Sequence, residues 1–369
     1  MKNVSKAAGR VFMVLAAALV LSSFGCQKIR KKIFKPPSGE VVYESIPARA
    51  HAYKMSMVFH TSPEELMSYF GKDLSWLEKG SRALEVNVDA LEVHTDMTEK
   101  GQSVEYTFRI LTFDLPCRMI CLKYKPDREL WWMMSVPRSG WILIRFDMKP
   151  VPEGCKLDLE VLGQITENMR PLLDNQRFMT ALTARADQVL TLVQAEFDPA
   201  LDVEDVLSRG LRGELFQTLL LGHQAEVWVD ASPEEVKDWV VEPENLSRVM
   251  EEFKIEDQYY VEFHQSTPGE VIYAPAVFEA GILKVGVDTF SLRMEDYIRI
   301  HMVAFNSVAY IHSEVSPDRG GTLLTMKFIG EVPGGGSPEI MKVMVYAGGI
   351  PRVLQEKVLI IKRGVEIQG

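Results

Sequence analysis

Apolar and polar residues alternate at residues 55–59 (MSMVF), which is the pattern of a β-strand with one buried face. Residues 225–229 (AEVWV) show the same pattern 170 positions later. Each stretch leads into Ser-Pro-Glu-Glu, at 62–65 and at 232–235. The serine can cap a helix, the proline fits its first turn, and the second glutamate can reach back to the cap. The sequence therefore predicts one strand-and-helix element that is built twice.

Two further matches extend this repeat. LSWL at 74–77 corresponds to LSRV at 246–249, and a Pro-acid-Gly turn at 152–154 corresponds to one at 317–320. Elements in the same order, with only slightly changed spacing, indicate an internal duplication. A chain of 369 residues has room for two domains of ordinary size, each with its own core.

Each half continues with a series of strand-like runs and closes with a long helix. The first long helix is predicted over 167–196 from apolar residues at helical spacing. The second is predicted to begin at Ser337, and AGGIP at 347–351 should break or kink it, because proline cannot donate a backbone hydrogen bond. Residues 259–265 (YYVEFHQ) count among the predicted strands of the second half, and 198–221 is predicted to form short linking helices.

The stretch VDASPEEVKDWVVEPENLSRVM (229–250) resembles the opening strand and helix pair of the START/polyketide-cyclase superfamily (SRPBCC). The succession of a strand, two short helices, antiparallel strands and a long helix is similar to the helix-grip fold of that family. The resemblance implies an α+β fold with two consecutive helix-grip domains, each a curved antiparallel sheet packed on a long C-terminal helix. The predicted bounds are 1–26 for a signal peptide, 27–47 for a tether, 48–197 for the first domain, 198–221 for the linker and 222–365 for the second domain.

The N-terminus has the pattern of an export signal. Residues 1–10 carry only positive charges, and 11–21 are apolar but too few to span a membrane stably. The following SSFGC resembles the bacterial lipoprotein signal, in which the cysteine, here Cys26, is lipidated and becomes the mature N-terminus. Ser23 stands where that signal usually has leucine, and the alternative is an ordinary secretory signal. We expect an exported lipoprotein that is anchored in the outer or inner membrane and faces the periplasm.

Charge is divided unevenly along the chain. Eight of the 41 Lys and Arg lie in the first 35 residues, which contain no Asp or Glu, so the remaining residues carry 33 basic against 51 acidic side chains. Such a body repels phosphates, and nucleic-acid binding is not expected. The basic residues of the tether fit either attraction to anionic lipid headgroups or a merely solvated linker.

The remaining cysteines and histidines show no motif for chemistry. Cys117 and Cys121 lie four residues apart in a strand-like run, about 13 Å, which is too far for a disulfide. Cys155 can pair with either of them, or all three are buried thiols. The spacing of zinc ligands and the GxSxG motif are absent, and PGGGS at 333–337 lacks the Lys-Ser/Thr of a phosphate loop. No catalytic residue, metal or cofactor is predicted, and the chain is not expected to be an enzyme.

A sheet that curls around a long helix leaves apolar space between them, and strand alternation indicates which side chains face it. In LWWMMSV (130–136), either Trp131 and Met133 or Trp132 and Met134 point inward. The candidate lining residues are Tyr106, Phe108, Trp131, Met133, Ile144, Phe146, Met179, Phe290, Met302, Met326, Phe328 and Met344.

Three functions are compatible with these patterns. The first is a lipid-anchored protein that binds or carries a hydrophobic small molecule or lipid in its helix-grip cavities. The second is a cyclase/aromatase-like enzyme, because the superfamily includes such enzymes. The third is an envelope scaffold without a pocket. An apolar cavity with two convergent polar groups would favour the enzyme, and solid interiors would favour the scaffold.

Overall fold

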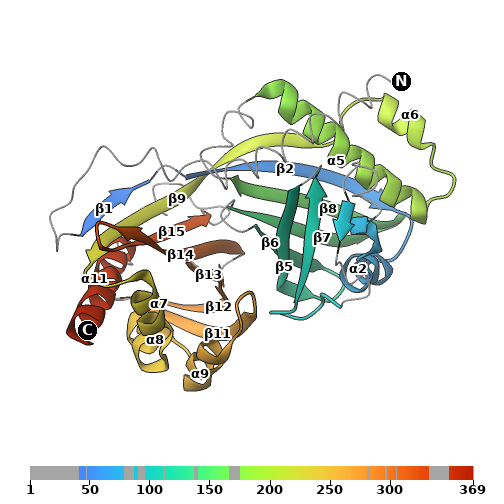
Figure 1. The fold of residues 1–369 in the computed structure, drawn as a ribbon. Coiled ribbons are helices and arrows are strands. Elements are labelled where there is room, and N and C mark those ends of the chain that lie inside the picture. Colours follow the sequence, from blue (N-terminus) through green and yellow to red (C-terminus); the bar gives the residue numbers. More distant parts are fainter. Residues whose placement is uncertain are drawn as a thin grey trace. The chain divides into compact units, whose positions relative to one another are not determined.

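The structure of the protein is a computed structural model, and it describes residues 41–46, 48–78, 87–89, 96–110, 113–136, 140–165, 175–280, 283–295, 297–304, 306–331 and 349–368. The chain divides into two compact units, which are drawn in Figure 1. The first unit contains Ala50–Thr218, and the second contains Leu219–Gly369 with the described residues of Ile33–Arg49.

The first unit is an antiparallel sheet with helices on one face. Its strands lie in the order β2-β8-β7-β6-β5-β4-β3. A helical turn at 75–78 follows α2, and the long helix α5 follows the last strand. The elements are β2 (Ala48–Phe59), α2 (Pro63–Lys72), β3 (Asn87–Asp89), β4 (Ser103–Ile110), β5 (Phe113–Lys125), β6 (Glu129–Val136), β7 (Gly140–Val151), β8 (Gly154–Ile165), α5 (Gln176–Phe197) and α6 (Val203–Ser208).

The core of the first unit is rich in aromatic rings. Phe70 on α2 stacks on Phe146 of β7 with ring centroids 4.6 Å apart, and Trp132 of β6 meets Phe146 edge-on at 5.2 Å. Trp76 stacks on Trp132 at 5.7 Å. Leu190 of α5 belongs to the same cluster. These rings bury a large apolar area on the inner face of the sheet.

The second unit repeats this succession. Its strands lie in the order β10-β11-β12-β13-β14-β15-β9, and the short strand β1 pairs with β9. Its core lies between one face of the sheet and the helices α7, α8, α9 and α11. The elements are β1 (Val42–Ser45), β9 (Glu214–Val229), α7 (Pro233–Val241), α8 (Pro243–Val249), β10 (Phe253–Lys254), α9 (Asp257–Gln265), β11 (Val271–Ala280), β12 (Leu283–Arg293), β13 (Tyr297–Ala304), β14 (Ser307–Asp318), β15 (Gly321–Glu331) and α11 (Ile350–Gln368).

Helices α2 and α7 begin where the repeat predicts. The hydroxyls of Ser62 and Ser232 accept hydrogen bonds from the backbone N–H groups of Glu65 and Glu235, each at 3.2 Å. In α7 the Glu235 carboxylate also accepts from the backbone N–H of Ser232 at 2.7 Å, which completes a capping box. Such a cap contributes about 1 kcal/mol, so the repeated Ser-Pro-Glu-Glu fixes both helix starts.

Two expectations about elements are corrected, and a third is not tested. Residues 259–265 form helix α9 rather than a strand, because Tyr259, Tyr260 and Phe263 are buried on one helical face. In the linker only Val203–Ser208 is helical, and β9 already begins at Glu214. The predicted start of the last helix at Ser337 lies outside the described residues.

The α+β class with antiparallel sheets is confirmed, and the described strands of each unit form an open sheet. Helix α11 begins at Ile350, directly after Gly349, whose φ of 70° is a conformation that glycine adopts without strain. Within the described ranges, no helix combines the length and apolar character needed to cross a bilayer.

Candidate functional site

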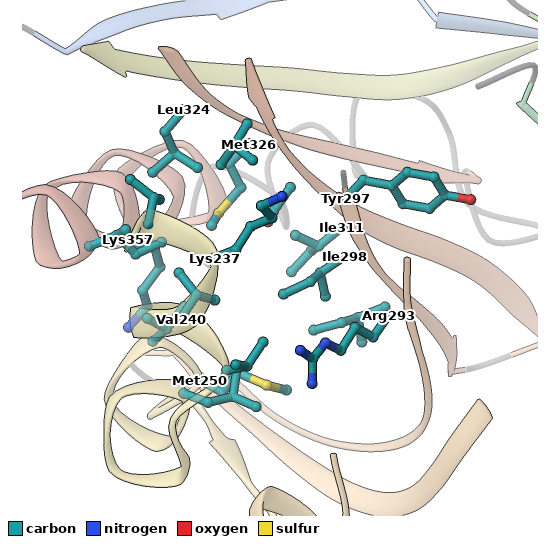
Figure 2. Close-up of a pocket in the computed structure, with 18 of the residues that line it drawn as sticks. Lys237, Val240, Met250, Arg293, Tyr297, Ile298, Ile311, Leu324, Met326 and Lys357 are labelled. Atoms are coloured by element: carbon teal, nitrogen blue, oxygen red, sulfur yellow. The ribbon is translucent and has the colours of Figure 1, made fainter. Parts of the chain in front are cut away.

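The second unit contains a cavity between its helices and the inner face of its sheet. Its volume is about 250 Å³, and its walls come from α7, α8, α11 and the strands β13, β14 and β15. Figure 2 shows the apolar side chains turned toward this space. The apolar wall includes Val240, Met250, Ile298, Ile311, Leu324 and Met326. Concave sites of this apolar character are typical of small-molecule binding.

Strand registers show which positions of the two units are equivalent. The β7–β8 turn is flanked by the pair Val151 and Gly154, and the β14–β15 turn by Asp318 and Gly321. Counting five residues back from Val151 and from Asp318 gives Phe146 in the first unit and Ser313 in the second. Ser313 lines the cavity, so an aromatic ring is replaced by a hydroxymethyl group at this position.

Two further positions show the same reduction in size. Trp132 pairs with Ile144, and Ile300 pairs with Ile311. Ile144 and Ile311 lie seven residues before Val151 and Asp318, so Trp132 and Ile300 are equivalent. Phe70 corresponds to Val240 at the 170-residue spacing of the Ser-Pro-Glu-Glu helices. Both Ile300 and Val240 line the cavity. Smaller side chains at three aromatic positions leave the space that the second unit has.

A charged pair is built into the cavity wall. Lys357 on α11 is 4 % exposed, and its ammonium lies 2.6 Å from the Glu252 carboxylate and 3.2 Å from that of Glu251. Glu252 is 13 % exposed, whereas Glu251 is 63 % exposed. Both Lys357 and Glu252 line the cavity. Removal of one partner from such a pair leaves a buried charge, which costs about 3–5 kcal/mol.

Two more cations lie at the cavity. The Lys237 ammonium on α7 donates a hydrogen bond to the backbone carbonyl of Glu295 at 3.0 Å. The Arg293 guanidinium, at the end of β12, donates to the backbone carbonyl of His264 at 3.1 Å. Both cations line the cavity, and both are labelled in Figure 2. The site is therefore an apolar space with charged groups placed at defined points of its wall.

The structure places the twelve predicted lining residues in different environments. Met326 lines the cavity, and Met302 and Phe328 belong to the core on the same face of the sheet. Tyr106, Ile144 and Phe146 belong to the core of the first unit, and Met179 is half-buried on α5. The side chain of Phe108, like Met344 and Cys26, lies outside the described part.

Trp131, Met133 and Phe290 lie on the opposite face of their sheets, which corrects the predicted orientation. In β6 the core receives Trp132 and Met134, so the inward set is shifted by one residue. The ring of Trp131 instead packs between the Lys123 ammonium, at 4.2 Å, and the Arg145 guanidinium, at 4.4 Å. Such cation–π contacts stabilise a tryptophan ring on the outer face of the sheet.

Phe290 is fully buried on the outer face of β12, where its ring lies 5.1 Å from that of Tyr273. His301 is its partner on β13 and is also fully buried. Burial first, and then Arg299, hold the pKa of His301 well below its ordinary value. Burial likewise lowers the pKa of His312 to about 4. These histidines are on the face opposite to the cavity and do not contribute to it.

Other candidate chemistry is structural in character. Cys117, Cys121 and Cys155 are buried thiols, and burial raises the pKa of Cys117 to about 12. Over the described ranges, no three His, Cys, Asp or Glu side chains are grouped so that they could hold a metal ion.

Sequence reasoning missed Glu252, Lys357 and Arg293. For Arg293, the sequence did contain a signal, which is a charged residue at an inward-facing strand position. Arg293 continues the alternation of Thr289 and Ser291, which face the helices.

No known protein family and no curated protein matches the sequence. Among solved structures, the chain is similar to the di-domain aromatase/cyclase (ARO/CYC) StfQ from the steffimycin biosynthetic pathway, with 9% identity over 85% of this chain and 98% of that chain and a TM-score of 0.32. It is similar to the di-domain ARO/CYC BexL from the BE-7585A pathway, with 11% identity over 83% of this chain and 98% of that chain and a TM-score of 0.30. Protein CV1439 from Chromobacterium violaceum is 15% identical over 39% of this chain and 98% of its own, with a TM-score of 0.30.

Two of these three structures are described as aromatase/cyclases. This finding overturns the expectation that the chain is not an enzyme, and that expectation is not retained.

Proposed function

We propose that the second unit binds an apolar, carbonyl-bearing small molecule and that the protein is a cyclase-like enzyme, which closes a ring in the bound molecule. The observation that carries this proposal is the pair of Glu252 and Lys357 in the wall of an apolar cavity. An apolar wall alone is enough to bind an apolar molecule. Burying a charged pair in that wall costs desolvation free energy that a purely apolar wall avoids, so the pair favours a chemical role.

The pair provides both proton transfers of an aldol ring closure. The Glu252 carboxylate accepts a proton from the carbon beside one carbonyl, and that carbon forms a bond to a second carbonyl carbon of the same chain. The Lys357 ammonium donates a proton to the oxygen of the attacked carbonyl. The proton on Glu252 then returns to Lys357 across their 2.6 Å contact. In the dehydration, the carbon between the carbonyl and the new alcohol loses a second proton to Glu252, the hydroxyl takes a proton from Lys357 and leaves as water, and a C=C bond forms.

The apolar wall supplies the second part of the mechanism. A flexible chain that reacts with itself must be folded so that its two reacting carbons approach, and a concave apolar wall favours such a folded conformer. The wall also excludes water, which would compete for the carbonyl groups. We further infer that each unit is a helix-grip domain, which is supported by its succession of strand, helices, sheet and long helix.

The test substrate is tridecane-2,6-dione, whose ring closure gives 3-heptylcyclohex-2-enone and water. The enone is followed by its absorbance, and binding is measured separately by calorimetry. We expect ring closure above the buffer rate, and a decrease of about 10²–10⁴-fold in the variant with both Glu252→Gln and Lys357→Met. Replacement of both partners avoids an unpaired buried charge, so this variant keeps its fold. Glu251→Gln is the matched control, because Glu251 is exposed.

A second variant tests the cavity itself. Ile300→Trp introduces the side chain that the first unit has at the equivalent position, and we expect it to abolish binding of the dione. Binding that survives this change would disprove the location of the site. Binding without ring closure in the wild-type protein would disprove the enzymatic part and leave a ligand-binding protein.

We also propose that the protein is exported and held at a membrane through a lipid on Cys26. This proposal is supported by the basic, apolar and small residues that precede Cys26 in the sequence.

A further inference from the structure

Arg293 differs from the other cations at the cavity in its set of partners. Lys357 is matched by the Glu252 carboxylate at 2.6 Å, and Lys237 lies 3.7 Å from the Glu234 carboxylate. Arg293 donates to a backbone carbonyl, and within the described part of the chain no carboxylate lies within 4.0 Å of it. A guanidinium has five N–H donors, so one hydrogen bond leaves most of its donors available to a ligand.

The orientation of Arg293 places these donors at the cavity. Figure 2 shows the guanidinium turned toward Met250, on the side where Ile298 also borders the space. Arg293 is paired with Ile298 across β12 and β13, and it is partly buried. A bound molecule that packs on Met250 and Ile298 therefore has the guanidinium within its reach.

The first unit has a different residue at this point. Leu130 pairs with Phe146, and Ile298 pairs with Ser313. Because Phe146 and Ser313 are equivalent, Leu130 and Ile298 are equivalent too. Leu130 pairs on its other side with Tyr124, as Ile298 pairs with Arg293. Where the second unit is open, it thus has a cation in place of an aromatic ring.

Three acidic side chains at the cavity do not compete for Arg293. Glu234, Asp238 and Glu295 are exposed to solvent. Exposed charges are strongly screened by water and salt, and they interact weakly with a partly buried group. The inner carboxylate, Glu252, is already paired with Lys357.

We propose that Arg293 binds the carboxylate of the ligand, and that the molecule accepted by this cavity is an apolar acid with one planar anionic end. Arginine binds a carboxylate through two parallel hydrogen bonds, which fixes both the position and the direction of the bound chain. This inference rests on the proposed function, and it specifies the substrate class as an apolar keto acid. The carboxylate at Arg293 sets which carbonyl of the chain reaches Glu252.

The test compares two ligands of equal chain length, decanoate and decan-1-ol, by isothermal titration calorimetry. The wild-type protein should bind decanoate at least tenfold more tightly than decan-1-ol. Arg293→Met keeps an apolar side chain of similar length, and we expect it to weaken decanoate binding about tenfold to a hundredfold while decan-1-ol binding changes less than twofold. Arg293→Lys should retain part of the preference, because it keeps the charge without the planar fork.

Arg363→Met is the matched control, because Arg363 is an exposed arginine on α11 and should not affect either ligand. Decanoate binding that is unchanged in Arg293→Met would overturn the inference. Equal losses for both ligands would also overturn it, because Arg293 would then support the wall rather than the anion. If neither ligand binds the wild-type protein, or if Ile300→Trp binds both normally, the proposed cavity function fails, which is distinguishable from failure at Arg293.

Discussion

The buried carboxylate of Asp187 should be the most sensitive polar position of the first unit. Asp187 on α5 is 2 % exposed, and its oxygens accept hydrogen bonds from the Tyr53 hydroxyl at 2.6 Å and from the backbone N–H groups of Arg212 and Gly213 at 2.5 and 3.1 Å. Burial, and then the bond to Asp187, raise the pKa of Tyr53, which therefore remains a donor. The carboxylate thus ties β2 and the segment before β9 to α5.

Asp187→Asn replaces one acceptor oxygen with an NH₂ group. Because both oxygens accept from backbone N–H groups, the new amide must turn a donor toward another donor in either orientation. In one orientation the part-buried Arg212 N–H loses its acceptor, and in the other the Gly213 N–H keeps only its 3.3 Å bond to the remaining oxygen. We expect a cost of about 1–3 kcal/mol. Tyr53→Phe removes only one hydrogen bond to a charged group, and we expect a loss of about 1.5–3 kcal/mol.

Hydrogen exchange measured by mass spectrometry resolves this effect locally. The peptide that contains Arg212 and Gly213 should exchange faster by about five- to a hundredfold in Asp187→Asn, while peptides of α11 should remain unchanged. Asp205→Asn, in the exposed helix α6, is the matched control and should alter exchange little. Equal protection of the 212–213 peptide in wild type and Asp187→Asn would refute this reasoning. So would strictly additive effects of Asp187→Asn and Tyr53→Phe, because groups that share a hydrogen bond should be coupled.

Three further predictions concern pH, thiols and the anchor. Because the folded pKa of His312 is about 4 and the unfolded value is about 6.5, the unfolded chain binds the proton first as pH falls, so stability should decrease by about 3 kcal/mol between pH 6.5 and 4. His312→Gln should flatten this decrease in thermal unfolding. Cys117, Cys121 and Cys155 should not react with Ellman's reagent until the protein unfolds, because they are buried and reaction requires the thiolate. Cys26→Ala should abolish incorporation of radiolabelled palmitate in a bacterial host.

Each of these predictions has a contrary outcome. An acid-unfolding profile that is identical in wild type and His312→Gln would show that folding does not lower the pKa of this histidine. Rapid labelling of any of the three thiols at neutral pH would contradict their burial. Palmitate incorporation that persists in Cys26→Ala would exclude this cysteine as the lipid attachment site.

The parts of the fold that were predictable are those in which the pattern is local. Ser62 and Ser232 mark helix starts because capping requires only residues within the next turn. Helix α9 was not predictable in the same way, because a run with buried Tyr259, Tyr260 and Phe263 fits a short strand as well as a helix. In β6, two consecutive tryptophans hide the phase of alternation, and an error of one residue moves Trp131 to the wrong face.

The cavity was harder to predict, because it results from volume that is missing at positions far apart in the sequence. Phe146 and Ser313 become comparable only when the pairs at the β7–β8 and β14–β15 turns fix the register of both hairpins. The spacing of the repeat changes along the chain, so alignment by eye leaves several residues of uncertainty at these strands. Ser313 and Ile300 replace the aromatic residues Phe146 and Trp132 of the first unit, so the two units differ at the cavity. Among the described residues, the first unit packs aromatic rings at these positions, and the second unit has a cavity beside Arg293 and the charged pair.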